Sequence, residues 1–294
     1  MKLEPECIGC LLDQMFRAFK LIRPNISSEI IISTQKKLMK YLIEIDINKT
    51  GSPIIGKVAY NLVAETLGVQ DPYYNLKKEY NHSALKVYDD VKNFIDKAQD
   101  PLFEAILVAA LGNTIDFATP HKIDFISDLK QFTSENMKIN DYFEFRKSLA
   151  NTNHLLIIGD NAGEIVFDKL LIATIKKFYP NLEIIYSVRS DPIINDATME
   201  DAKQVGLTEL VTVIESCSAP GIDLSMITDN FKKHFNLKKG VVLSKGQGNF
   251  ESLYQIEVPN KELYYLLKAK CNLMKRIFNV EIGDLIFKKK TEGF

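Results

Sequence analysis

The sequence predicts an α/β protein in which an all-helical N-terminal part precedes a mostly parallel sheet with helices on both faces. Two observations lead to this prediction. Apolar residues recur at helical spacing through the first 117 residues, and short apolar runs alternate with helical stretches after residue 154. Strands that alternate with helices are typical of parallel sheets. We place the change between residues 120 and 152 and predict domains at 1–145 and 146–294.

Five helices are expected in the first part, each with apolar residues three and four positions apart: Cys10–Leu21, Glu29–Glu44, Pro53–Leu67, Asn81–Ala98 and Pro101–Phe117. Prolines and glycines between them indicate turns and first helical turns. The stretch Leu102–Leu111 is almost wholly apolar. The last of these helices is therefore expected at the centre of its bundle.

Five buried strands are expected in the second part: Leu155–Ile158, Ile184–Val188, Leu210–Ile214, Val241–Leu243 and Leu285–Phe287. Helices are expected between them: Gly163–Phe178, Asp196–Val205, Ser225–Phe235 and Tyr264–Lys270. This alternation predicts that most strands run parallel and are joined by helical crossovers.

Composition excludes several classes of partner. The chain has 46% hydrophobic and 26% charged residues and a net charge of −1. No global field therefore favours nucleic acid or an anionic membrane surface. No apolar run approaches the roughly 20 residues that cross a bilayer, and the acidic N-terminus does not fit a signal peptide. We expect a cytoplasmic protein that binds neither nucleic acid nor membrane.

Polar, turn-forming residues follow the expected strands. Asp160 and Asn161 come directly after the first strand, within Gly159-Asp160-Asn161-Ala162-Gly163-Glu164, and Arg189 follows the second, leading to Asp196. The fourth is followed by Lys245, on a loop made flexible by Gly246 and Gly248. Because the carboxyl ends of parallel strands open on one edge of a sheet, we expect these residues to converge in one crevice.

The residue types in this crevice indicate a divalent cation and a phosphate. Asp160, Asn161 and Asp196 supply oxygen atoms, which favour Mg²⁺ or Mn²⁺ over a zinc site of Cys and His. Lys245, with backbone amides beside it, suits a phosphate oxyanion. Such an ion lowers the pKa of bound water and neutralises the transferring group. The pattern predicts hydrolysis of a phosphate ester, with Asp160, Asp196 and Lys245 as catalytic residues.

Structural explanations compete with this interpretation. Asp160 and Asn161 could form only a turn that caps the next helix, and Asp196 could be the N-cap of a helix that begins at Ala197. Lys245 could simply be solvated. The functional interpretation depends on all of these residues lying at adjacent strand ends.

Two further motifs have alternatives. Asn113 and Asp116 are three residues apart on one helix face, where they serve either a buried hydrogen-bond network or substrate hydroxyls. Cys7 and Cys10 have the spacing of half a zinc site or of a redox pair, or are two unrelated thiols. A zinc-binding scaffold without catalysis is the corresponding third function.

The order of the motifs resembles the metal-dependent damage-control phosphatases, formerly a family of unknown function. The motifs are Cys7-Ile8-Gly9-Cys10, Asp71-Pro72-Tyr73 with Lys77 and Asn81, Asp100-Pro101-Leu102, Gly112-Asn113 with Asp116, Gly159–Glu164, Pro192–Thr198, Lys245–Glu251 and Lys270-Cys271. The cysteine pair resembles the stand-alone microbial and archaeal branch. Cys217 departs from the pattern, because the family usually has glycine in that loop.

The resemblance implies a Rossmann-like α/β/α domain against a helical domain, with the active site between them. It implies a divalent ion, Mn²⁺, Co²⁺, Ni²⁺ or Mg²⁺, held by Asp160, Asn161 and Asp196, and a small phosphorylated metabolite as substrate, such as a sugar phosphate or a damaged phosphometabolite. The substrate-binding residues are expected to be Asn113, Asp116, Arg189, Lys245 and Gly246.

The alternative is a nucleotide- or S-adenosylmethionine-binding protein, such as a carboxyl methyltransferase, that uses the same crevice. The sequence fits it less well. No glycine-rich fingerprint follows the first strand, and the second strand ends in Arg189 in place of the acidic residue that holds a ribose.

Overall fold

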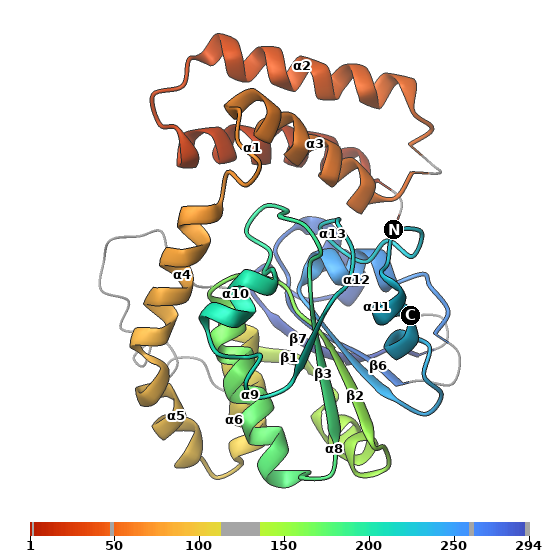
Figure 1. Ribbon diagram of the computed structural model, residues 1–294. Coiled ribbons are helices and arrows are strands. Elements are labelled where there is room, and N and C mark those ends of the chain that lie inside the picture. Colours follow the sequence, from red (N-terminus) through yellow and green to blue (C-terminus); the bar gives the residue numbers. More distant parts are fainter. Residues whose placement is uncertain (2, 48–49, 113–135, 259–261, 292–294) are drawn as a thin grey trace.

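A seven-stranded sheet forms the centre of the protein, and three N-terminal helices stack across one end of it (Figure 1). The computed structural model describes residues 1, 3–47, 50–112, 136–258 and 262–291. The strands are β1 (Met137–Asn140), β2 (His154–Ile158), β3 (Glu183–Val188), β4 (Thr212–Glu215), β5 (Val241–Lys245), β6 (Glu262–Lys268) and β7 (Leu285–Lys289). Their order across the sheet is β1-β7-β6-β5-β2-β3-β4.

Strands β2 to β6 run parallel, and β7 pairs with β6 in the antiparallel direction. Strand β1 is parallel to β7 and closes that edge. All residues of β2 and of β5 are buried. Near-continuous apolar runs are typical of strands covered on both faces. The predicted α/β class with a mostly parallel sheet is confirmed.

The helices begin and end where local chemistry predicts. Proline occupies the first turn of three of them, where its missing N–H is not needed, and Asp100 caps α6 by accepting from the Phe103 N–H at 3.2 Å. The described helices are α1 (Pro5–Ile22), α2 (Ser28–Glu44), α3 (Ser52–Leu67), α4 (Tyr74–Lys86), α5 (Tyr88–Asp96), α6 (Pro101–Leu111), α8 (Tyr142–Ala150), α9 (Glu164–Phe178), α10 (Met199–Gln204), α11 (Asp229–Phe235), α12 (Gln247–Leu253) and α13 (Asn272–Phe278).

Three clusters of apolar side chains hold the layers together. The first packs α6 and α9 against one face of the sheet, with α4, α5, α8 and α10 contributing side chains. The second packs α11, α12 and α13 against the other face. The third lies among α1, α2 and α3 and also contains Ile193, from the loop after β3. That loop is therefore anchored to the N-terminal helices.

Several predicted elements need correction. Tyr264–Lys270, predicted as a helix, lies mostly in strand β6. The prediction was wrong because a short apolar run that is buried on both faces lacks the alternation that distinguishes a strand from a helix. The helix predicted over Asn81–Ala98 is two helices that meet at Val87, and the first begins at Tyr74. Strand β1 was not predicted. The end of the helix predicted to reach Phe117 lies outside the described residues, and the domain division near residue 145 stays a prediction.

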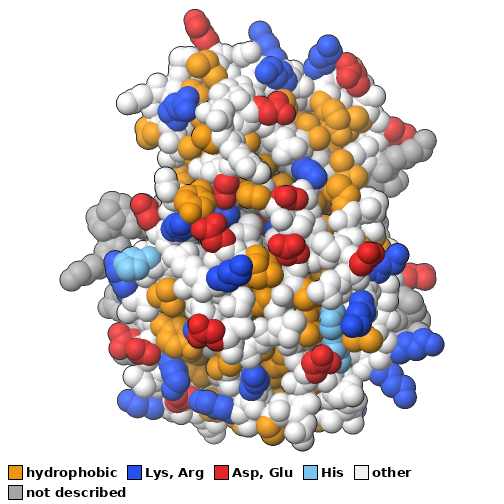
Figure 2. Space-filling model, in the orientation of Figure 1, with side chains coloured by type: hydrophobic (Ala, Val, Ile, Leu, Met, Phe, Trp, Pro, Cys, Tyr) orange, Lys and Arg blue, Asp and Glu red, His pale blue; other side chains and the backbone are white. Residues whose placement is uncertain are grey.

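Charges of both signs are interspersed on the face drawn in Figure 2, in keeping with a net charge of −1. Among the described helices, none has both the length and the apolar character to cross a membrane.

Candidate active site

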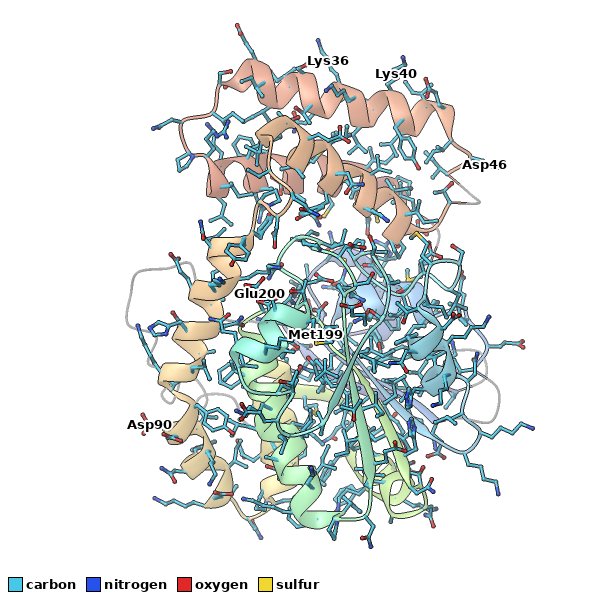
Figure 3. The ribbon with its side chains drawn as sticks, in the orientation of Figure 1. Lys36, Lys40, Asp46, Asp90, Met199 and Glu200 are labelled. Atoms are coloured by element: carbon cyan, nitrogen blue, oxygen red, sulfur yellow. The ribbon has the colours of Figure 1, made fainter. Side chains whose placement is uncertain are left out.

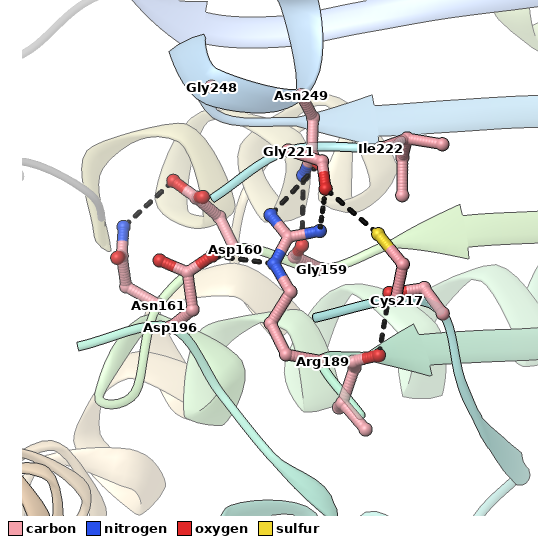
Figure 4. Close-up of polar contacts among 12 residues, drawn as sticks. Gly159, Asp160, Asn161, Arg189, Asp196, Cys217, Gly221, Ile222, Gly248 and Asn249 are labelled. Carbon is pink, nitrogen blue, oxygen red and sulfur yellow. Dashed lines mark hydrogen bonds and ion pairs between the residues drawn. The ribbon is translucent and has the colours of Figure 1, made fainter. Parts of the chain in front are cut away.

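The candidate site lies at the carboxyl end of β2, where the strand order reverses. The chain proceeds from β2 to β3 and β4 on one side and then returns to β5 on the other side of β2. Ligands of open α/β sheets bind at such a switch point. The turn after β2, the loop after β3 and the end of β5 meet there (Figure 4).

Backbone hydrogen bonds join the first two of these segments. Asn161 and Asp196 form an isolated antiparallel bridge. The Ala162 N–H donates to the Asn195 carbonyl at 2.9 Å, and the Ala197 N–H donates to the Asp160 carbonyl at 2.8 Å. The three predicted ligands therefore come together from two loops, and both carboxylates are buried, with exposed fractions of 9% for Asp160 and 5% for Asp196. Neither is the N-cap of the following helix, a position held by Gly163 and Thr198.

The Asn161 amide is oriented by its hydrogen bonds. Its Nδ2 donates to Asp160 Oδ2 at 2.8 Å and to Glu164 Oε2 at 3.4 Å. Because an amide nitrogen donates and its oxygen accepts, these contacts assign Oδ1 to the other side of the group. An amide oxygen and two carboxylates are a donor set that suits a hard divalent cation.

Arg189 is buried and supports Asp196, and its predicted contact with substrate stays a prediction. Its side chain is 1% exposed, and its Nε donates to Asp196 Oδ2 at 2.6 Å. The other guanidinium nitrogens donate to Asn249 Oδ1 at 2.9 Å and to the Gly221 carbonyl at 3.2 Å (Figure 4). This planar set of contacts leaves Asp196 Oδ1 on the side away from the arginine.

Cys217 has a structural role in the loop after β4. The buried thiol donates to the same Gly221 carbonyl at 3.2 Å and accepts from the Asp223 N–H at 3.5 Å (Figure 4). Burial raises the pKa of Cys217, so the group stays a neutral thiol. It therefore fixes the turn against which Arg189 rests.

Lys245 is the last residue of strand β5, and not part of a flexible loop as predicted. Its side chain is completely buried, and Nζ forms ion pairs with Glu164 Oε1 and Asp168 Oδ1 on α9. Tyr186 also donates to Asp168, at 2.7 Å. Sequence reasoning missed this role of Glu164 and Asp168. The available signal was two carboxylates four residues apart on the apolar face of one helix.

Negative charge exceeds positive charge in this buried cluster. Four carboxylates (Asp160, Glu164, Asp168 and Asp196) face the two cations Arg189 and Lys245, which leaves −2 when every group is ionised. Burial raises the pKa of Glu164 to about 7 against the opposing effect of Lys245, and the charge of Asp160 adds to the rise. Burial also raises the pKa of Asp196 to about 6 against Arg189, again with a contribution from Asp160. One divalent cation would balance the excess charge.

The residues at the site fit such an ion if its third protein ligand is the amide oxygen of Asn161, because no third carboxylate of the described residues is available for that position. Nowhere in the described ranges do three or more His, Cys, Asp or Glu side chains gather to hold a metal. Asp160 and Asp196 therefore depend on Asn161 for a third ligand. Cys7 and Cys10 are free thiols, and Cys10 is exposed.

Gly246 brings the backbone that follows β5 against Asp160, one of the predicted metal ligands. Its φ of +80° is strained for other residues, and a Cβ there would come within 2.0 Å of Asp160 Oδ2. The turn thus packs closely against the Asp160 carboxylate. Contact between the Gly246 backbone and substrate stays a prediction. Asn113 and Asp116, the remaining predicted substrate-binding residues, lie outside the described residues.

We predict that Gly246→Ala weakens Mn²⁺ binding at least tenfold, because the methyl group must displace Asp160. Titration calorimetry with Mn²⁺ measures this. Gly68→Ala is the matched control: its φ is +71°, yet nothing lies within 4 Å of the added methyl. Both variants should lose about 1 kcal/mol of stability from the strained backbone. Equal Mn²⁺ affinity in the two variants would contradict the prediction.

Helix α4 joins the turn after β2 to the loop after β3. Asn81 Oδ1 accepts from the Gly163 N–H at 2.7 Å, and its Nδ2 donates to Asp201 at 2.9 Å. Glu200 lies at the start of α10 (Figure 3), where it accepts from the Tyr74 hydroxyl at 3.0 Å. These contacts fix α4 directly to the segments that carry the ligands.

The sequence profile of the damage-control phosphatase ARMT1-like domain matches residues 3–286. The chain belongs to this family. It is 32% identical to a damage-control phosphatase of Pyrococcus horikoshii over 97% of both chains, and 31% identical to one of Archaeoglobus fulgidus over 98% of this chain and 99% of the relative. The crystal structure of a DUF89 family protein from Pyrococcus horikoshii is similar, with a TM-score of 0.87, 29% identity and coverage of 99% of this chain and 100% of that one.

Membership of the damage-control phosphatase family confirms the predicted function class. The chain is a phosphatase, and hence a hydrolase, and metal dependence is general in the family. The alternative of a nucleotide-binding protein or methyltransferase is replaced by this assignment. That the Cys7–Cys10 pair marks one branch of the family stays a prediction.

Proposed function

We propose that the chain hydrolyses small phosphomonoesters, such as sugar phosphates or damaged phosphometabolites, with a divalent cation held by Asp160, Asn161 and Asp196. The cation is Mn²⁺, Co²⁺, Ni²⁺ or Mg²⁺. The observation that carries the proposal is the convergence of these three side chains, from two loops, in a buried cluster with excess negative charge. Hydrolysis in the family assigned above supplies the reaction type.

Two supporting residues hold the ligands in place. Arg189 donates to one oxygen of Asp196 and leaves the other for the ion. Glu164 accepts from the Asn161 amide nitrogen, while its second oxygen pairs with Lys245. Partners of this kind fix the orientation of metal ligands and tune their basicity. Arg189 and Glu164 are therefore positioning residues in the proposed mechanism.

In this mechanism Lys245 neutralises and positions the carboxylates of Glu164 and Asp168. Its ammonium is already engaged by two carboxylates, so in this arrangement it stabilises the acidic side of the site. When bound, the cation neutralises charge on the phosphoryl group and lowers the pKa of a water molecule. Asp160 and Asp196 would hold that cation, each through a carboxylate oxygen.

The test is metal-dependent release of inorganic phosphate. We predict that the protein treated with a chelator and then dialysed does not hydrolyse p-nitrophenyl phosphate or sugar phosphates. Addition of Mn²⁺, Co²⁺, Ni²⁺ or Mg²⁺ should restore turnover, and circular dichroism should show the same fold before and after. Turnover that persists after complete removal of metal, or none with any of these metals in folded protein, would refute the proposal.

A further inference from the structure

Helix α3 packs against α12, the helix that follows the Gly246 turn, and its Tyr60 shares an apolar cluster with Ile193 from the loop that carries Asp196. Gly56 lets the helix approach the loop after β4, since a Cβ there would come within 2.9 Å of Pro220 Cγ. The neighbouring Gly221 accepts from Arg189 in the site. Tyr60 follows Gly56 by four residues and so lies on the same face of α3.

The Tyr60 hydroxyl is buried without a hydrogen-bond partner among the described residues. The side chain is 6% exposed, and its ring packs near that of Tyr73, with centroids 6.4 Å apart. The Asp71 carboxylate lies beside it and raises its pKa, in part through a side-chain interaction, but both oxygens of Asp71 have other partners: Oδ1 accepts from the Tyr73 N–H at 3.0 Å and Oδ2 pairs with Lys77 at 2.8 Å. Buried hydroxyls nearly always have partners, so this one is poised for a ligand.

Electrostatics make this hydroxyl a donor. Burial, followed by the charge of Asp71, the hydroxyl of Tyr73 and the charge of Asp196, raises the pKa of Tyr60. The group therefore stays protonated at neutral pH. Ile193, which shares the apolar cluster of Tyr60, lies three residues before Asp196. A neutral O–H donor near a cation site suits an anionic acceptor.

We propose that Tyr60 is a substrate-binding residue whose hydroxyl donates a hydrogen bond to a phosphate oxygen of the bound phosphomonoester. The assignment rests on the proposed function, because the phosphate must lie at the ion held by Asp160, Asn161 and Asp196. It gives the N-terminal helices a direct part in catalysis. The phosphate would then be held from the sheet side by the cation and from the helical side by Tyr60.

The experiment compares wild-type enzyme with Tyr60→Phe, which removes one oxygen atom and keeps the ring. With Mn²⁺ present, kcat/KM for p-nitrophenyl phosphate should fall roughly tenfold or more, as expected for a lost hydrogen bond to a charged group. Inhibition by inorganic phosphate should weaken by a similar factor. Mn²⁺ affinity measured by calorimetry should not change, and the Tm should stay the same or rise, because an unpartnered hydroxyl is removed.

Tyr264→Phe is the matched control. Tyr264 is also buried, but its hydroxyl shares a hydrogen bond of 2.6 Å with Ser148 on α8. This variant should lose stability and keep wild-type kinetics and phosphate inhibition. Wild-type kinetics and phosphate inhibition in Tyr60→Phe would overturn the assignment of Tyr60 alone. If wild-type enzyme releases no phosphate with any metal, the proposed function fails and the assignment fails with it.

Discussion

Replacing Asp160 with Asn should reduce phosphatase activity by on the order of 1,000-fold while the protein stays folded. A bound metal supplies several kcal/mol of transition-state stabilisation, and each 1.36 kcal/mol changes a rate about tenfold. The metal-free variant should be no less stable than wild type, because the charge of Asp160 raises the pKa values of both Glu164 and Asp196 and thus repels them. Initial rates at a low, fixed Mn²⁺ concentration, together with thermal unfolding of the metal-free proteins, measure both effects.

Glu183→Gln is the control for this change. Glu183 is the first residue of β3, exposed at the opposite end of the strands, so its variant should keep wild-type activity. Higher Mn²⁺ concentration should recover part of the activity of Asp160→Asn if the lost ligand acts through metal affinity. Activity within a fewfold of wild type, at low Mn²⁺ concentration, would show that Asp160 is not a ligand.

Replacing Lys245 with Met should lower the free energy of unfolding by about 3–5 kcal/mol, which is the usual cost of removing one partner from a buried ion pair. Met has a similar length but no charge, so Glu164 and Asp168 would remain buried without their cation. Urea unfolding followed by fluorescence or circular dichroism measures the change. Activity should fall as well, because Glu164 would no longer be held against Asn161.

Two further variants separate these causes. Lys238→Met removes an exposed lysine just before β5 and should change neither stability nor activity. Adding Asp168→Asn to Lys245→Met should recover part of the lost stability, because one of the uncompensated charges is removed. Lys245→Met with wild-type stability would mean that the two carboxylates do not depend on this lysine.

The predictability of the fold from sequence varied with the kind of element. Strands such as β2 were predictable because a short apolar run between turn residues has few alternatives in an alternating chain. Strand β6 was mistaken for a helix because its residues are buried on both faces and show no alternation. Strand β1 has a mixed burial pattern over four residues, and its pairing with β7 joins segments almost 150 residues apart. No local pattern contains that information.

The convergence of the three proposed ligands was predictable because Asp160 and Asn161 lie in the turn after β2 and Asp196 lies in the loop after the neighbouring strand β3. The environment of Lys245 was not, because its partners lie on α9 and only the packing of that helix brings them to β5. Arg189 shows the same limit. Its position after β3 suggested access to substrate, whereas its actual partners, Asn249 and Gly221, come from two other loops.

The N-terminal helices belong to two different apolar cores, and this division affects which parts of the protein can change independently. Helices α4 to α6 share a core with the sheet, and α4 is bonded to the turn that carries Asn161, whereas α1 to α3 form a core of their own with Ile193 as their contact from the loop of Asp196. The first three helices thus form a layer whose core is separate from the core that supports the predicted metal ligands. Substitutions within this separate core can therefore change the surface of the layer that faces the sheet without repacking the core beneath α6 and α9.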